Sequence, residues 1–328
     1  MGSIAKSYPP GIHVPSLTWF RSDDTQSIDW ELQERHLEFL VRSGLHGIVI
    51  AGTNGEAATL TPDEKSRLVS LTRSVAQKQG RADLAITCGT FGGCTQAIIE
   101  DTKLACKAGA DYALVLVPSY FHFALDSDAI VAFFQEVASA SPIPIVIYNF
   151  PGVVSGLNVN SEMLQTLGDH PNIVAVKLTC GTIASVSRTV AKFGPGLAKS
   201  GAQPSFVALA GQSDWLVPCL SVGGTGCITG LANLFPKACI EIFNLYTSGK
   251  KAKAEELQLQ LASVEWGFGK GGINGTKWVV GKYREYPEDS TWCRRPYPKF
   301  LDEGKREWIT ETVKPLQKVE EALVQRDA

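Results

Sequence analysis

Short apolar runs rich in β-branched residues recur along the chain, with starts 21 to 37 residues apart. Most of the intervals between them hold apolar residues at helical spacing, so candidate strands and helices alternate. This alternation is typical of parallel βαβ units. Eight such units make an α/β (β/α)8 TIM barrel, and a doubly wound sheet is the main alternative. The predicted strands are Ile12–Thr18, Gly47–Ala51, Leu84–Cys88, Tyr112–Val117, Ile143–Tyr148, Ile173–Leu178, Ser205–Leu209 and Gly226–Thr229.

Several intervals carry helix signals of their own. Ile28–Val41 has an apolar stripe that includes Leu32 and Leu40. Thr61–Val75 opens with Thr-Pro-Asp-Glu, which supplies an N-cap, a proline at the first helical position and acidic residues in the first turn. Further helices are predicted over Ser127–Val137 and Ser161–Leu167.

The pattern changes near residue 235. Helices are predicted over Phe235–Tyr246 and Ala252–Val264, followed by a Gly-rich loop from Gly267 to Gly275. A last helix is expected within Trp308–Val324, mainly beyond Pro315, because proline disfavours a helix interior. We therefore expect a catalytic barrel over residues 11–235 and a helical extension over residues 236–328 that packs on it. The loop fits G-x-G-x-x-G, but it follows a helix and not a strand, so the context of a dinucleotide site is absent.

Composition narrows the classes of partner. The net charge is −2 and the charged fraction 20%, so there is no general electrostatic case for nucleic acid or an anionic membrane. No apolar run approaches the roughly 20 residues of a membrane span. The N-terminus resembles no secretory signal, so a cytoplasmic location is the default expectation. The eight cysteines form no C-x-x-C pair and the five histidines show no ligand spacing, so buried free thiols and no metal site are expected.

Lys177 is the least expected residue, because it lies within a β-branched run at the end of a central strand. Burial disfavours a charged ammonium, so a neutral, nucleophilic amine becomes accessible near neutral pH. Such an amine can attack a ketone and form an imine. The alternative is a lysine whose stem is buried and whose amine reaches solvent.

Other predicted strands also end in unusual residues. Tyr148 closes the fifth strand, where a phenol can transfer protons, although strand tyrosines often only pack. The second strand ends in Gly52-Thr-Asn-Gly-Glu56, where Thr53 and Asn54 beside exposed backbone N–H groups could hold a carboxylate. A plain βα turn is the alternative. The seventh and eighth strands lead into Gly211-Gln-Ser-Asp214 and Gly226-Cys-Ile-Thr-Gly230, whose glycines allow a ligand close approach or serve barrel closure.

Taken together, these strand ends resemble one family, the dihydrodipicolinate synthase and N-acetylneuraminate lyase superfamily of class I, pyruvate-dependent aldolases. The resemblance covers about Gly11 to Pro236. It is carried by Gly52–Glu56, by Tyr148-Asn-Phe-Pro151, by Lys177 and by Gly226-Cys-Ile-Thr-Gly-Leu-Ala-Asn233.

The resemblance implies a role for each matching residue. Lys177 would form the Schiff base and Tyr148 would shuttle the proton. Thr53 and Asn54 would hold the pyruvate carboxylate or relay protons, and Ile228 would offer its backbone carbonyl. Tyr120 aligns with a tyrosine that the family lends across a dimer interface, so a homodimer or homotetramer is expected.

Differences from the family pattern narrow the substrate. Dihydrodipicolinate synthases carry an arginine where this chain has Val153, and valine cannot pair with a second carboxylate. Asn54 is similar to the 4-hydroxy-2-oxoglutarate aldolase branch. Thr179 matches a hydroxyl-binding position of the sialic-acid lyase branch. With Ser213, Asp214 and Thr229, it suggests a polar pocket for a hydroxylated aldehyde.

The resemblance therefore implies an aldolase that cleaves a 2-keto-3-deoxy sugar acid to pyruvate and an aldehyde, with an imine on Lys177 and no metal or organic cofactor. The alternatives are a 4-hydroxy-2-oxoglutarate aldolase, a synthase-like condensation, and an aryl-pyruvate hydratase-aldolase if Phe121, Phe123 and Phe150 line the pocket. A barrel that only senses a keto acid is the non-enzymatic alternative.

Overall fold

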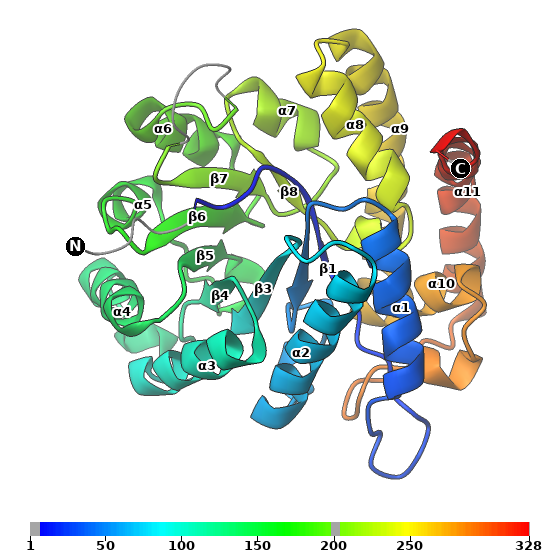
Figure 1. The fold of residues 1–328 in the computed structure, drawn as a ribbon, viewed down its shortest axis with the longest axis horizontal. Coiled ribbons are helices and arrows are strands. Elements are labelled where there is room, and N and C mark those ends of the chain that lie inside the picture. Colours follow the sequence, from blue (N-terminus) through cyan, green and yellow to red (C-terminus); the bar gives the residue numbers. More distant parts are fainter. Residues whose placement is uncertain (1–6, 198–203, 328) are drawn as a thin grey trace.

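Eight parallel strands close into a barrel in the computed structural model, which describes residues 7–197 and 204–327 (Figure 1). Each strand pairs with its neighbours in chain order, and β1 closes the barrel by pairing with β8. The predicted (β/α)8 barrel is confirmed. The strands are β1 (Gly11–Pro15), β2 (Gly47–Ile50), β3 (Ala85–Thr90), β4 (Tyr112–Leu116), β5 (Ile145–Asn149), β6 (Ile173–Leu178), β7 (Val207–Ala210) and β8 (Gly226–Ile228).

Helices α1 to α7 alternate with the strands and surround the barrel (Figure 1). At α2, the Thr61 side chain accepts from the Glu64 backbone N–H while Glu64 reaches back to Thr61, so the start predicted from the sequence is a full capping box. The helices are α1 (Trp30–Arg42), α2 (Pro62–Lys78), α3 (Thr95–Ala108), α4 (Ser127–Ala140), α5 (Ser161–Leu167), α6 (Ile183–Phe193) and α7 (Leu216–Ser221).

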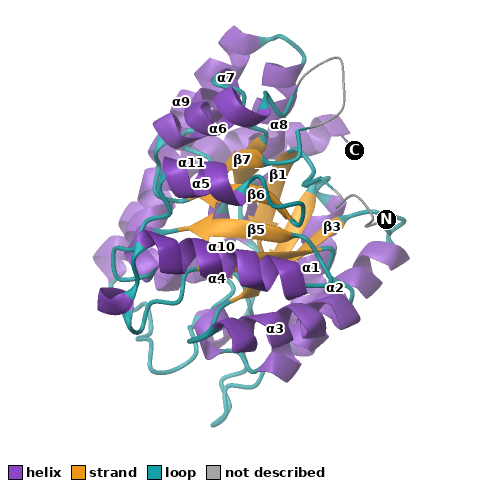
Figure 2. Ribbon diagram, turned by 90° about the vertical axis from the view of Figure 1, so that its left-hand side faces the viewer, coloured by secondary structure: helices purple, strands orange, loops and turns teal. Residues whose placement is uncertain are grey.

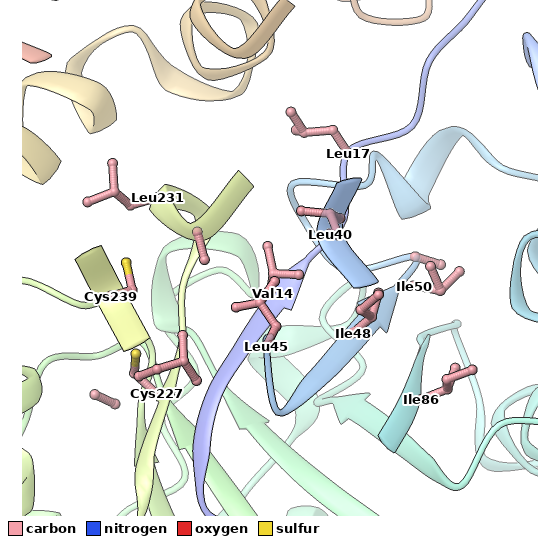
Figure 3. Packing of buried hydrophobic residues seen from close by; sticks show 14 of the residues in the cluster. Val14, Leu17, Leu40, Leu45, Ile48, Ile50, Ile86, Cys227, Leu231 and Cys239 are labelled. Carbon is pink, nitrogen blue, oxygen red and sulfur yellow. The ribbon is translucent and has the colours of Figure 1, made fainter. Parts of the chain in front are cut away.

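Two apolar layers hold the strands in place. The larger layer lies between strands and helices, and Figure 3 shows part of it, with Val14 and Ile48 of the barrel near Leu40 and Cys239 of the helices. The smaller layer fills the barrel and includes Tyr148. All eight cysteines are free thiols, as expected, but only five of them are buried, since Cys94 is exposed and Cys106 and Cys180 are partly exposed.

Four helices follow β8: α8 (Pro236–Thr247), α9 (Lys251–Lys270), α10 (Gly272–Tyr283) and α11 (Glu303–Asp327). They gather on one side of the barrel, with α8 next to α7 and with α10 and α11 outside α1, and Figure 2 shows the helical layer around the strands from the side. None of the helices within the described ranges has the length and apolar run that crossing a bilayer requires.

The prediction of a Gly-rich loop from Gly267 to Gly275 is wrong. This stretch is helical except at Gly271, where α9 ends and α10 begins. Its glycines permit close packing. A Cβ at Gly267 would lie 2.3 Å from Thr312 Cγ2, and one at Gly271 would lie 2.8 Å from Ile309 Cδ1. The small residues let α9 and α10 approach α11, so they are contact positions and not helix breakers.

The last helix is also longer than expected. It begins at Glu303 and contains Pro315 in its interior, so the expectation that it lies mainly beyond Pro315 is wrong. Ile309, Val313 and Leu316 are buried on one stripe that continues past the proline. Burial of this stripe against neighbouring helices offsets the roughly 3 kcal/mol that an interior proline costs.

Candidate active site

The register of β5 and β6 places Tyr148 directly beside Lys177. Both side chains are almost fully buried, with 4% and 3% exposed, and Lys177 Nζ lies 4.3 Å from the centroid of the Tyr148 ring. The other buried lysine, Lys277, has an ion-pair partner, whereas Lys177 has none among the described residues. An unpaired amine at the carboxyl end of a barrel strand is suited to nucleophilic attack on a carbonyl.

The turn after β2 brings Thr53 to the same place. Thr53 Oγ1 lies 3.1 Å from Tyr148 Oη, so the hydroxyl and the phenol share a hydrogen bond. Ala51 and Glu56 bracket the turn in the left-handed region, at φ 54° and 55°. Gly55 is required because a Cβ there would lie 2.8 Å from the Ser16 carbonyl oxygen. The tight turn thus aims Thr53 at the phenol.

Two other predicted residues lie near this centre. Ile228 is fully buried in the barrel interior, in the same apolar cluster as Tyr148. Asn54 turns toward the segment after β8, where its Nδ2 would lie 2.8 Å from a Cβ on Gly230. Asn54 therefore faces the segment after β8, and its role in holding a carboxylate stays a prediction.

A cleft opens above Tyr148 and Thr53. Its lining is mostly apolar and includes Val153, the position where an arginine would have clamped a second carboxylate. Glu56 is the one charged residue among the described lining residues, and it is paired with Lys277. The lining also includes Phe91, Tyr120, Ile273 and Tyr297.

Tyr120 lies at the outer edge of this cleft, with 81% of its surface exposed and its ring against Phe121. The aromatic residues expected of an aryl pocket do not gather there. Phe121 and Phe123 are exposed, and Phe150 packs 5.8 Å from the Tyr148 ring without lining the cleft. The condition set for an aryl-pyruvate substrate is therefore not met by these three residues.

The four residues expected to form a hydroxyl-binding pocket lie on the other side of the barrel mouth, after β6, β7 and β8. Ser213 and Thr229 are fully buried and both donate to the carboxylate of Glu265 on α9, at 2.5 and 3.0 Å. Burial first, and then the nearby Asp214, raise the pKa of Glu265 to about 7. The Ser213 and Thr229 hydroxyls are thus already engaged by the protein.

Two other polar atoms in this region have no partner. Thr179 Oγ1 and Asp214 Oδ1 are buried and form no hydrogen bond with the described residues. Burial also raises the pKa of Asp214. Of the predicted pocket, therefore, Thr179 and Asp214 each have a polar atom that lacks a hydrogen-bond partner among the described residues. The roles of Thr179, Ser213, Asp214 and Thr229 in substrate binding stay predictions.

The C-terminal region supplies residues that hold the turn after β2, and the sequence pattern did not reveal them. Lys277 Nζ donates to Glu56 Oε1 at 2.8 Å, and Arg294 N–H donates to Glu56 Oε2 at 2.8 Å. The burial of Glu265 could have been predicted from the sequence, because Glu265 shares one helical face of α9 with the apolar residues Leu261 and Phe268. An acid on an apolar helical stripe is a candidate buried group. Lys277 had no such signal, because its partner lies 221 positions away.

Among the described residues, no cluster of three His, Cys, Asp or Glu side chains could hold a metal ion. The Tyr148 phenol and the Thr53 hydroxyl line an apolar cleft, and the buried Lys177 amine lies against the Tyr148 ring without lining the cleft itself. Groups of this kind can form an imine and move protons without another ion.

Comparison with known proteins agrees with this arrangement. Residues 9–315 match the sequence model of the Dihydrodipicolinate synthetase family. The chain is 38% identical, over 88% of each chain, to the Emericella nidulans protein named "Probable 4-hydroxy-2-oxoglutarate aldolase, mitochondrial". It is 36% identical to the L-threo-3-deoxy-hexylosonate aldolase of Hypocrea jecorina, over 97% of this chain and 99% of that protein.

Solved structures share the whole architecture. A dihydrodipicolinate synthase family protein from Coccidioides immitis superposes with a TM-score of 0.85 at 34% identity, over 98% of this chain and 100% of the other. A dihydrodipicolinate synthase from Acinetobacter baumannii, solved with pyruvate, gives 0.83 at 25% identity, over 94% and 99%. With its barrel, its strand-end residues and these matches, the chain belongs to the Dihydrodipicolinate synthetase family.

Proposed function

We propose that this protein is a class I aldolase that cleaves a 2-keto-3-deoxy sugar acid to pyruvate and a neutral aldehyde. The observation that carries the proposal is the buried, unpaired Lys177 amine beside the Tyr148 phenol, which is itself bonded to Thr53. A relative with this kind of substrate in its name covers nearly the whole chain. The relative solved with pyruvate supports the keto-acid half.

The reaction uses these groups in turn. The Lys177 amine attacks the C2 ketone, and the hydroxide that leaves takes the phenolic proton of Tyr148 to form water, which gives an imine protonated on nitrogen beside a Tyr148 phenolate. Tyr148, with Thr53 as its hydrogen-bond partner, takes the proton of the C4 hydroxyl as the C3–C4 bond breaks. The electrons of that bond pass into the imine, and the aldehyde leaves. The resulting enamine is protonated at C3, and water then releases pyruvate from the lysine.

The cleft lining favours a neutral aldehyde over glyoxylate. Release of glyoxylate requires a site that tolerates a second carboxylate, which usually means a cationic partner. The described lining residues include no cation, and their one carboxylate, Glu56, is already paired. Cleavage of 4-hydroxy-2-oxoglutarate remains the second candidate because a relative with that name is 38% identical.

The decisive experiment traps the imine. The protein is incubated with pyruvate, reduced with borohydride and mapped by mass spectrometry, and we expect a permanent adduct on Lys177. Lys177→Ala should lose both the adduct and pyruvate release from a panel of 2-keto-3-deoxy acids. Lys103→Ala, which alters an exposed lysine, is the matched control. Retained activity in Lys177→Ala would remove the mechanism, and an adduct without turnover on any keto acid would favour a sensor.

Three further features belong to the proposal. The chemistry needs no organic cofactor or metal, since the imine itself accepts the electrons. The exposed Tyr120 and its neighbours support assembly as a homodimer or homotetramer, because exposed aromatic groups often pack at interfaces. Native mass spectrometry would test the oligomeric state. A cytoplasmic location also stays a prediction, which imaging of a tagged protein would test.

A further inference from the structure

The cleft has a closed inner end and an open outer end. At the inner end, Tyr148 is 4% exposed and is bonded to Thr53. At the outer end, Tyr297 is 45% exposed. On the proposed function, a keto acid held on Lys177 enters the cleft beside Tyr148, so its carbons beyond C4 extend toward the outer wall.

Part of that outer wall comes from outside the barrel. Ile273 lies in the first turn of α10, and Tyr297 lies in the segment between α10 and α11. Both line the same cleft as Phe91 and Val153, which follow β3 and β5. The C-terminal segment thus closes a cleft whose chemistry resides on the strands.

The segment that carries Tyr297 is firmly held by the β2–α2 region. The Arg294 guanidinium donates to both carboxylate oxygens of Glu64, at 2.9 and 2.7 Å, and holds the pKa of Glu64 below its usual value. The same guanidinium donates to the backbone carbonyls of Gln26 and Thr59. A bidentate arginine with further carbonyl contacts fixes both position and orientation.

Further bonds hold the same segment on both sides of Tyr297. The Arg294 backbone N–H donates to Glu56, and Lys277 Nζ donates to the Trp292 carbonyl at 2.9 Å. Asn274 Nδ2, next to Ile273 in α10, donates to the Pro298 carbonyl at 2.8 Å. Tyr297 therefore sits between two anchored points and presents a fixed surface to the cleft.

We propose that Tyr297 and Ile273 are specificity-determining residues that contact the part of the substrate beyond C4 and select neutral, hydroxylated aldehydes of three or more carbons. This inference rests on the proposed function. The Tyr297 ring offers an apolar face to the C–H groups of a hydroxylated chain, and its phenol can bond one hydroxyl. Ile273 supplies apolar contact, and the uncharged wall rejects an acceptor that carries its own carboxylate.

The test measures chain-length selectivity in the condensation direction, with pyruvate and aldehydes of increasing length. Glycolaldehyde, glyceraldehyde and threose serve as the neutral series, and glyoxylate as the charged acceptor. In Tyr297→Ala and Ile273→Ala, we expect kcat/KM to fall about tenfold or more for threose and less for glycolaldehyde. Tyr297→Phe, which keeps the ring, should lose only the part that depends on the phenol.

Two controls separate this inference from the proposed function. Leu301→Ala removes an exposed side chain near the segment that does not line the cleft, and it should leave selectivity unchanged. The borohydride adduct with pyruvate should form normally in every variant, which shows that the inner site is intact. Equal losses for all aldehydes, or no loss with threose, would overturn the inference. Absence of the adduct in the unaltered protein would instead overturn the proposed function.

Discussion

Lys277 Nζ lies 2.8 Å from Glu56 Oε1, and both side chains are essentially inaccessible to solvent, at 0% and 1% exposed. The pair joins α10 to the turn that carries Thr53, across 221 positions of sequence. A buried ion pair is weak evidence for stability by itself, but loss of one partner leaves an uncompensated charge in the interior. The pair therefore ties the C-terminal helices to the reactive end of the barrel.

Replacing Lys277 with methionine should lower the free energy of unfolding by about 3–5 kcal/mol, because Glu56 would remain buried without its partner. Urea denaturation followed by circular dichroism measures this change. The matched control is Lys78→Met, which breaks the exposed pair with Glu34 and should cost no more than about 1 kcal/mol. If the two variants lost similar amounts of unfolding free energy, burial of the Lys277–Glu56 pair would not be what makes its loss costly.

The bond between Thr53 and Tyr148 gives a prediction about proton transfer. Tyr148→Phe removes the phenol and should lower kcat by about 10²- to 10⁴-fold, the usual contribution of a general acid–base group. Thr53→Val keeps the shape of the side chain and removes its hydroxyl, so it should give a smaller loss. Both should still form the borohydride adduct with pyruvate, since Lys177 is intact. An unchanged kcat in Tyr148→Phe would remove Tyr148 from the proton path.

Local patterns predicted the alternating units of the barrel and singled out Lys177 and Tyr148 as strand-end residues, and the resemblance to the family implied that they act together. Lys177 follows a run rich in β-branched residues and Tyr148 ends the preceding predicted strand, and parallel pairing of the two strands brings them side by side. The same reasoning did not reveal the partner of Ser213 and Thr229, because Glu265 reaches them from a helix beyond the barrel. A strand-end hydroxyl does not reveal whether it faces a ligand or a distant carboxylate of the same chain.

The C-terminal region was the hardest to predict for a related reason. Glycine lowers helix propensity by about 1 kcal/mol, so dense glycines favoured a loop. In the structure, Gly267 and Gly271 are needed because Thr312 and Ile309 approach them closely. This approach involves residues about 40 positions apart, and tertiary contact at that separation overrides local propensity without leaving a local signal.

Glu265 predicts a pH dependence of stability. Its pKa is raised to about 7 in the folded protein, mainly by burial and also by Asp214, from an ordinary value of 4.5. Between these values the folded state binds more protons than the unfolded state, so stability falls as pH rises through this window. This pKa shift corresponds to about 3 kcal/mol of unfolding free energy, which is present at low pH and lost once pH exceeds the folded-state pKa.

A Glu265→Gln variant removes this titration. Between pH 5 and pH 8, the unfolding free energy of the unaltered protein should fall by about 2 to 3 kcal/mol relative to the variant, as measured by urea denaturation. Glu320, whose pKa burial also raises to about 7, is present in both proteins and cancels in the comparison. A constant difference across this pH range would show that Glu265 does not take up a proton on folding.

Two glycines of α9 provide a matched test of why this stretch is glycine-rich. A Cβ at Gly267 would lie 2.3 Å from Thr312 Cγ2, so Gly267→Ala must displace α11 or the threonine and should destabilise the fold by about 1–3 kcal/mol. Gly269, two residues along the same helix, has nothing within 4 Å of its Cβ position. Gly269→Ala should therefore stabilise by about 0.5–1 kcal/mol through helix propensity alone. Thermal melts of the two variants measure both effects, and stabilisation by both would mean that α9 and α11 do not pack as closely as described.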